Sequence, residues 1–191
     1  MIAYFVGFLI RNNALDEEYK EESIYGLTIA LEKIIAYILL TGVAFLIKKP
    51  ISGTIFIISF LMLRQTTGGY HAKSFWRCLA GSVLVFLLAI EVITPLLMRY
   101  EIIAGIILIF SSVIIWRFAP VNHRNLSLSE NELKEYSTWS RVVLGMESGT
   151  TIIGFLLHMR WRQYIMVAII LCAVLILLAK ILNQEVDYDE D

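Results

Sequence analysis

The stretch RQTTGGYHAKSFWRC, residues Arg64 to Cys78, is a polar segment between two long apolar runs. It contains a cysteine, a histidine seven residues before it, a glycine pair and three cations. Most of the remaining chain is apolar and is interpreted as helix. These features predict a membrane protein whose helices hold this one loop at the boundary between water and lipid.

The composition of the chain also indicates a membrane protein. Of its 191 residues, 58% are hydrophobic and 17% are charged, whereas soluble domains have roughly 45–50% apolar and roughly 25% charged residues. The formal net charge of −1 gives no electrostatic reason to expect binding to nucleic acid. The length predicts one integral membrane domain over 1–191, with an interfacial or cytosolic N-terminal segment over 1–23 and an acidic tail over 183–191.

Six apolar runs predict an all-α fold, a polytopic membrane bundle of about six hydrophobic helices. The second run has only 13 residues, so it must recruit the polar residues after Arg64 or lie in a thinned or re-entrant position. The fifth run is diluted by Glu147 and by nearby small polar residues. The hydrophilic segment before it, 117–141, is expected to be a loop with a short helix, started by Ser129 in a capping-box pattern with Glu132. The runs cover residues 24–47, 51–63, 78–98, 102–116, 142–157 and 164–182.

The distribution of basic residues predicts the orientation in the membrane. With six spans, 11 of the 16 lysine and arginine residues fall on the side of the termini and the polar loop, and five fall on the other side. Because cytoplasmic loops carry an excess of Lys and Arg, we expect a multi-pass protein of the cell membrane with both termini and the polar loop in the cytoplasm. The first ten residues are apolar but too short to cross, and they predict an interfacial helix or a flexible start.

Cys78 lies where a thiol can become a nucleophile. It opens the third apolar run, and the unsatisfied N–H groups at a helix start give that end partial positive charge. Arg77 adjoins it, while Arg64 and Lys73 are close in sequence. Positive charge favours the thiolate, which is the reactive form. Backbone N–H groups at this helix start could also bind the oxyanion of a tetrahedral intermediate.

His71 is the obvious base for this thiol, but a straight helix would not bring the two together. Seven residues make two helical turns, so the side chains would share a face about 10 Å apart. Direct proton transfer needs about 2.6–3.2 Å. A His71–Cys78 dyad therefore requires the backbone to bend, and Gly68 and Gly69 supply the conformational freedom for the bend.

This pattern is carried by Arg64, Gly68, Gly69, His71, Ala72 and Cys78. It resembles the signature of the accessory gene regulator protein B (AgrB) family, the membrane peptidases of Gram-positive quorum sensing. The length, the polar N-terminal segment and the several spans are similar too. By this resemblance, His71 and Cys78 map onto the catalytic histidine and cysteine, and Arg64 and Gly69 onto a conserved arginine and glycine of the family.

The resemblance implies a definite reaction and partners. The enzyme cysteine would cleave an AgrD-like autoinducer propeptide at its C-terminal side and keep the rest as an acyl-enzyme thioester. A cysteine or serine inside the propeptide would then displace the thioester and close a thiolactone or lactone ring. The family resemblance also implies a homodimer. Lys73, Arg77 and Arg64 are then either anchors at the cytoplasmic surface or a dock for an acidic part of the substrate.

Two acids inside apolar runs leave another function open, a small transporter or channel that uses Glu91 and Glu147 as an ion or proton path. We favour a structural interhelix hydrogen bond for Glu91, because it lies about 20 Å along a helix from Cys78. Glu147 is the better placed of the two as a third catalytic residue. A non-catalytic scaffold whose loop binds a partner is a third possibility.

The remaining candidates favour structural roles. Cys172 lies among Leu, Ala and Val in the last apolar run, and we interpret it as a packing residue. Two cysteines are too few for a disulfide framework. His123 and His158 are expected at the interface, since neither has a partner at metal-ligand spacing. The sequence therefore predicts no metal and no cofactor.

Overall fold

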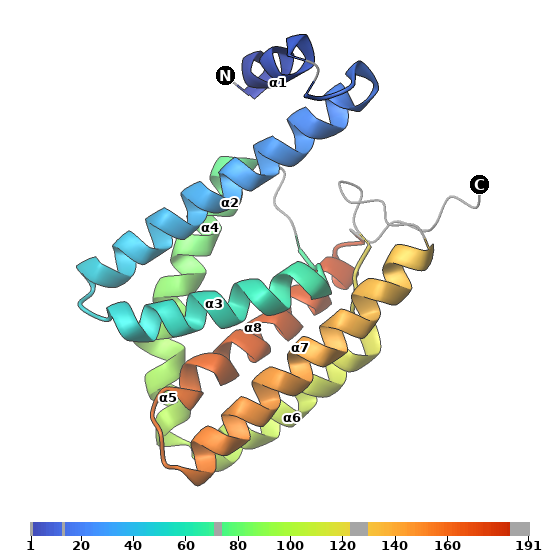
Figure 1. Cartoon of the computed structure of the whole chain (residues 1–191). Coiled ribbons are helices and arrows are strands. Elements are labelled where there is room, and N and C mark those ends of the chain that lie inside the picture. The colour runs from blue at the N-terminus through green and yellow to red at the C-terminus, as the bar shows by residue number, and fades with distance from the viewer. Residues whose placement is uncertain (1, 13, 71–73, 123–129, 184–191) are drawn as a thin grey trace.

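The chain folds into an all-α membrane bundle, as predicted (Figure 1). The computed structural model describes residues 2–12, 14–70, 74–122 and 130–183. Within these ranges no β-strand occurs, and the only β-type pairing is an isolated bridge between Gly68 and Val121. The elements are α1 (Ile2–Arg11), η1 (Glu17–Tyr19), α2 (Lys20–Leu46), α3 (Pro50–Thr67), α4 (Phe75–Leu88), η2 (Ala89–Ile93), α5 (Thr94–Arg99), α6 (Glu101–Phe118), α7 (Glu130–Leu156) and α8 (Arg162–Ile181).

Four helical segments of the described chain are long and apolar enough to cross a membrane: Glu17–Leu46, Phe75–Arg99, Glu101–Phe118 and Arg162–Ile181. They correspond to the predicted runs one, three, four and six. The short second run lies in α3, which continues beyond the apolar residues to Thr67 and so recruits the polar residues after Arg64. The start of the chain forms the short apolar helix α1.

The structure corrects the expectation for the fifth run. Residues 130–141, which were expected to belong to the loop, and the predicted span form one continuous helix of 27 residues, α7. Its polar first half and apolar second half pack as one rod beside α3, α6 and α8. The helix begins at Glu130, so Ser129 of the predicted capping box lies outside the described residues. The polar and the apolar half of α7, which differ in composition, therefore pack against the bundle as one helix.

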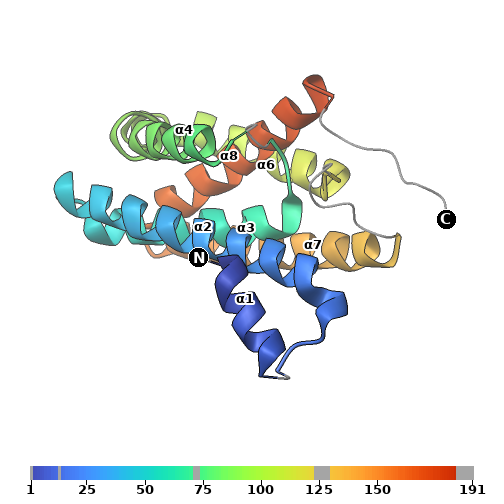
Figure 2. The ribbon, with the colours of Figure 1, turned by 90° about the horizontal axis from the view of Figure 1, so that it is seen from above.

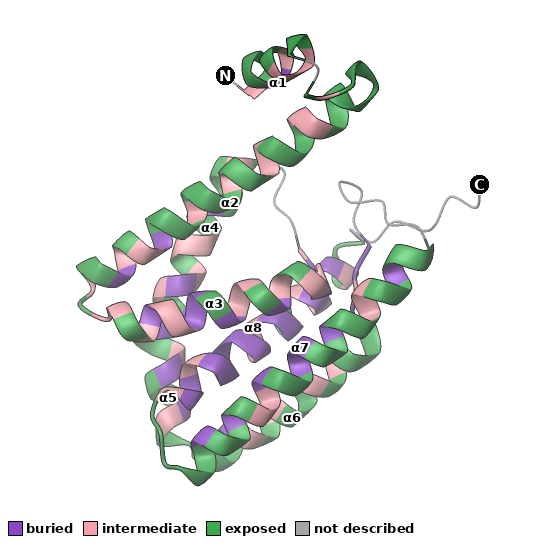
Figure 3. Ribbon diagram, in the orientation of Figure 1, coloured by how far each residue is buried: buried purple, intermediate pink, exposed green. Residues whose placement is uncertain are grey.

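Helix α8 forms the centre of the bundle. It contacts α3, α6 and α7, and Figure 3 shows that its ribbon is the most continuously buried of the helices. Seen from above, α2, α3 and α7 lie in one row, α4 lies on the other side, and α8 crosses obliquely between them (Figure 2). Large apolar side chains on the outer faces remain exposed, as a surface in contact with lipid requires.

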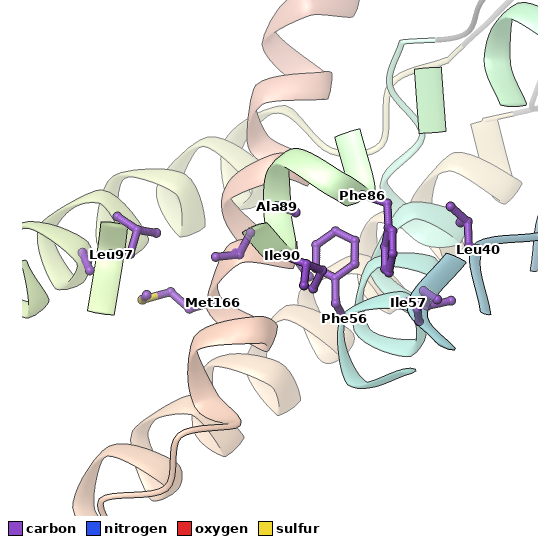
Figure 4. Packing of buried hydrophobic residues seen from close by; sticks show 12 residues of the cluster. Leu40, Phe56, Ile57, Phe86, Ala89, Ile90, Leu97 and Met166 are labelled. Carbon is purple, nitrogen blue, oxygen red and sulfur yellow. The ribbon is translucent and has the colours of Figure 1, made fainter. Parts of the chain in front are cut away.

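An aromatic cluster joins α3 to the third span. The Phe56 ring stacks on Phe60 with centroids 5.6 Å apart and meets Phe86 of α4 at 5.9 Å (Figure 4). Aromatic pairs at these distances stabilise packing beyond the area that they bury. Gly53 permits the close approach of α2, since a Cβ there would lie 2.5 Å from the Ala44 Cβ.

The third span contains one π-helical segment, η2, immediately before Pro95. Proline lacks an N–H group, and its ring collides with the carbonyl of the residue four positions earlier, here Glu91. A wider π turn relieves this conflict. Both the backbone N–H and the Oγ1 of Thr94 donate to the Ala89 carbonyl oxygen, the side chain at 2.7 Å. Pro95 therefore explains the wider turn, and Thr94 satisfies the Ala89 carbonyl oxygen within it.

The helix ends gather at two ends of the bundle (Figure 1). At the first, which we call the Cys78 end, α3, α6 and α8 finish while α4 and α7 begin. At the opposite end lie the connections after α2, α5 and α7. This arrangement places 68–70 on the same side of the bundle as 119–122.

Candidate active site

The turn after α3 is fixed to the bundle by backbone atoms. Gly68 has a φ of +64°, and its N–H donates to the Arg64 carbonyl oxygen at 3.3 Å. This conformation ends the helix and favours glycine. The segment after α6 runs alongside, and the Val121 N–H donates to the Thr67 carbonyl oxygen at 2.9 Å. The turn is therefore held in one position against the α6–α7 connection.

Gly69 occupies the narrowest place in this turn. Its φ is +118°, and a Cβ built on it would lie 2.6 Å from Nη1 of Arg64 and 3.3 Å from the Leu175 carbonyl of α8. The next residue, Tyr70, donates its N–H to that same Leu175 carbonyl oxygen at 3.1 Å. Both glycines adopt a positive φ, as the conformational freedom predicted for them allows, and the resulting turn is held by contacts with Arg64 and α8.

Arg64 lies beneath this turn with its guanidinium turned inward. Its Nη2 donates to the Tyr70 carbonyl oxygen. Its Nη1 is buried and has no hydrogen-bond partner in the described part of the chain. The thiols of Cys172 and Cys78 both lie within electrostatic reach of this guanidinium. Arg64 therefore both braces the turn and brings a positive charge close to the exposed cysteine.

Cys78 lies in the first turn of α4, and its thiol is exposed. Its N–H donates to the carbonyl oxygen of the N-cap residue Ser74 at 3.0 Å. The three residues between them are the first of the helix, and N–H groups at such positions have no acceptor within the helix. The prediction that Cys78 stands at the start of the third span is confirmed, because this helix begins at Phe75.

The other predicted site residues are placed less fully. His71 and Lys73 lie outside the described residues, so the dyad with Cys78 stays a prediction. Arg77 is exposed beside Cys78. His123 also lies outside the described residues, and His158 is exposed at the opposite end. In the described ranges no group of three or more His, Cys, Asp or Glu side chains could hold a metal ion.

The two embedded acids have different surroundings. Glu91 accepts a hydrogen bond from the Lys49 Nζ at 2.9 Å, so the interhelix hydrogen bond that we favoured for it is confirmed. Glu147 is buried midway along α7, and neither of its oxygens has a hydrogen-bond partner among the described residues. Its carboxyl interacts with Cys172, which is buried and donates weakly to the Phe60 carbonyl oxygen at 3.9 Å. Cys172 is therefore a packing residue.

Sequence reasoning missed the contribution of residues 119–122. Ala119, Val121 and Asn122 are buried there, and the segment is paired with the glycine turn across more than 50 residues of chain. This pairing uses backbone N–H and carbonyl groups, which every residue except proline offers. No residue pattern in the sequence could have signalled it.

Gly69→Ala should destabilise the protein through the close contacts of this turn. A residue with a Cβ at this φ is strained by about 1–3 kcal/mol, and the added methyl group would also have to displace Arg64. We expect the melting temperature of the purified protein to fall by about 2–4 °C for each kcal/mol lost. Gly81→Ala is the matched control, since nothing lies within 4 Å of a Cβ at that helical position. Equal melting temperatures of the two variants would contradict the packing described for Gly69.

Comparison with known proteins extends the similarity beyond the polar loop. The sequence profile of the family described as Accessory gene regulator B matches residues 2–183 of this chain. A protein of Clostridium perfringens (strain SM101 / Type A), whose name describes it as AgrB-like, is 26% identical over 190 residues. That match covers 90% of this chain and 88% of the relative. No solved structure matches the chain. The similarity thus includes every helix from α1 to α8.

Proposed function

Because the chain belongs to the accessory gene regulator B family, and so has a role in processing a quorum-sensing peptide, we propose that it acts as a membrane cysteine endopeptidase. Its substrate is an AgrD-like propeptide, which it cuts at the C-terminal side. Cys78 is the nucleophile, and His71 is the general base. The observation that carries this proposal is the exposed thiol of Cys78 in the first turn of a spanning helix.

The position of Cys78 suits attack on a peptide that arrives from the water–lipid boundary. The thiol is exposed, whereas Cys172, the other cysteine of the chain, is buried in the bundle. The Arg64 guanidinium lies within electrostatic reach of this sulfur. The glycine turn holds Tyr70, the residue before His71 in the sequence, against α8.

In the first step, His71 takes the proton of the Cys78 thiol, and the sulfur bonds to the carbonyl carbon of the scissile peptide. The carbonyl oxygen becomes an oxyanion. The N–H groups at the start of α4, which have no acceptor within the helix, are suited to stabilise it. The C–N bond then breaks, the amine leaves with the proton from His71, and an acyl thioester remains on Cys78.

In the second step, a cysteine or serine within the bound propeptide attacks the thioester carbonyl. Its proton passes to the base, and the bond from the carbonyl carbon to Cys78 breaks, which restores the thiolate. Exchange between thioesters conserves the activation of the acyl group, whereas attack by water would lose it. A site at the mouth of lipid-facing helices restricts water and so favours ring closure.

The proposed location and partners follow from the same chemistry. We place the protein in the cell membrane with the Cys78 end and both termini in the cytoplasm, because most of the basic residues lie on that side. The propeptide would then meet the thiol at the inner surface of the bilayer. Assembly as a homodimer belongs to this proposal by family membership.

Mass spectrometry of the acyl-enzyme tests the proposal directly. The full chain would be co-expressed with a short AgrD-like propeptide, for example one encoded beside its gene, and rapidly quenched. We expect a mass increase equal to the N-terminal part of the propeptide on the tryptic peptide with Cys78, removable by hydroxylamine because thioesters react with this nucleophile. A released C-terminal fragment without any adduct on Cys78 would overturn the proposed nucleophile.

A further inference from the structure

A long apolar groove lies between α6, α7 and α8, away from Cys78. It encloses about 830 Å³, and its lining follows α6 from Glu101 to Arg117. At about 1.5 Å of rise per residue this stretch is about 24 Å long, most of the ~30 Å thickness of a hydrocarbon core. Ile109, Val113 and Ile152 line it and are more than half exposed. The groove therefore offers a continuous apolar channel across much of the bilayer.

A basic cavity of about 580 Å³ adjoins the groove at the Cys78 end, and Arg117 lines both. Its other charged side chains are Lys134, Arg141, Lys180 and Glu130. Glu130 lies 3.6 Å from Lys134 and offsets the charge of that lysine. Arg117 and Arg141 form no ion pair within the described ranges. The cavity therefore has an excess of positive charge.

Aromatic rings mark the border between the two spaces. The Arg141 guanidinium lies over the Trp116 ring at 5.1 Å, and the Lys180 ammonium over the Phe118 ring at 5.2 Å. These cation–π contacts hold the charges at the rim. Trp116 itself lines the groove, and tryptophan is enriched where the hydrocarbon meets the headgroups. The lining thus changes from charged side chains to apolar ones within one turn of α6.

We propose that this pair of cavities is a binding site for an anionic phospholipid. The phosphate binds in the basic cavity near Arg117 and Arg141, and an acyl chain follows the groove along α6. Basic pockets between spanning helices bind anionic headgroups in this manner. A ligand that is anionic at one end and apolar along its length matches both spaces, and anionic lipid surrounds such a site in any bacterial-type membrane.

Phospholipid fits the site better than a peptide or a second copy of the chain. Positive charge at one end and a long apolar groove together match an anionic headgroup and its acyl chain. A peptide would also bring polar backbone groups into the groove. Ser148 Oγ and Gln163 Oε1, which are buried there without partners among the described residues, are atoms that could bind such groups. These two atoms allow a peptide to be distinguished from lipid in the experiment.

The proposed lipid site also adjoins the glycine turn. Ala119 and Pro120 line the basic cavity, and the next residue, Val121, donates its N–H to the Thr67 carbonyl oxygen. A bound headgroup would therefore support the segment that holds the glycine turn. We expect phosphatidylglycerol to raise the melting temperature of the purified protein more than phosphatidylcholine does.

The headgroup half is tested with the purified full-length chain in detergent, titrated with phosphatidylglycerol or phosphatidylcholine and followed by native mass spectrometry. Each basic side chain near an anionic lipid contributes about fivefold in affinity, so Arg117→Gln with Arg141→Gln should weaken phosphatidylglycerol binding roughly 30-fold. Phosphatidylcholine binding should not change. Arg99→Gln with Arg160→Gln removes the same charge at the opposite end and should have no effect.

The groove half is tested by filling it. Gly105 and Gly145 line the groove, and nothing lies within 4 Å of a Cβ at either position. The Cβ of a leucine at either position would therefore meet no neighbouring atom, and the two side chains should fill the groove. We expect this to reduce the amount of retained phosphatidylglycerol at least about tenfold. Gly81→Leu is the matched control, because its Cβ direction is equally open and it is outside the groove.

Each outcome decides for or against the proposal. Unchanged binding in both the arginine and the glycine variants, or equal binding of the two lipids by the wild type, would overturn it. A change in oligomeric state with unchanged lipid binding in the glycine variants would assign the groove to a second copy. Ser148→Ala with Gln163→Leu should leave phosphatidylglycerol binding intact; a loss of propeptide binding there, with lipid binding unaffected by groove filling, would assign it to a peptide. These measurements need no peptidase activity, so they are independent of the proposed function.

Discussion

Replacing Cys78 by alanine should abolish cleavage of the propeptide while the protein keeps its fold. Loss of a nucleophile lowers turnover by about 10⁴-fold or more, because the acyl-enzyme thioester can no longer form on Cys78. The side chain is exposed in the first turn of α4, so the melting temperature should not change. Immunoblots of co-expressed, epitope-tagged propeptide measure the cut, with membrane levels of the protein as the reference.

Cys172→Ala is the matched control for this experiment. Its thiol is buried against α3, so we expect normal cleavage and only a modest loss of stability from the missing sulfur. Normal cleavage by Cys78→Ala would remove the peptidase proposal. If Cys78→Ala also stayed functional while Glu91→Gln lost function, the transporter reading based on Glu91 and Glu147 would be favoured instead.

Replacing His71 by alanine should lower the cleavage rate by about 10²–10⁴-fold, the usual contribution of a general base. Without the imidazole, the proton of the thiol would have to pass to water or hydroxide. We therefore expect the small remaining activity of His71→Ala to rise with pH more steeply than that of the wild type. Cleavage in proteoliposomes buffered at each pH gives the profile.

His158→Asn controls for the loss of an imidazole elsewhere. This residue is exposed at the opposite end with a φ of +53°, a conformation that asparagine also tolerates. We expect its cleavage rate and pH profile to equal those of the wild type. A wild-type rate in His71→Ala would show that another group takes the proton from Cys78.

Much of the fold follows from apolar patterning, because a helix that crosses lipid needs a long apolar run and little else. The four long apolar spans agree with the sequence prediction for this reason. The α7 helix does not, since its first half is polar and packs against the bundle in a way that hydropathy does not detect. The recruitment of residues up to Thr67 into α3 was one of two alternatives, and only packing against α8 and α7 decides between them.

The residue types of the candidate site could be predicted from the sequence, but the contacts that hold its turn in place could not. Residue types identify Cys78 as the thiol at a helix start, because a cysteine between cations at the edge of an apolar run is visible in the sequence. Glycine at position 69 was predicted for its conformational freedom, which its positive φ uses, but the neighbours that confine it could not be predicted. Its confinement comes from Arg64 and from Leu175, and the second of these lies more than 100 residues away in the chain.

The π-helical segment before Pro95 has a consequence for where the thiol points. A π turn holds one residue more than a regular turn, and each residue of an α-helix corresponds to about 100° of rotation. The part of this span beyond η2, helix α5, is packed against α6 and α8. Deleting one residue within Ala89–Ile93 would therefore swing Cys78 by roughly 100° around the helix axis. The direction in which the Cys78 side chain points therefore depends on the π-helical segment that begins eleven residues further along the chain. A deletion in this segment would change that direction more than a substitution there would.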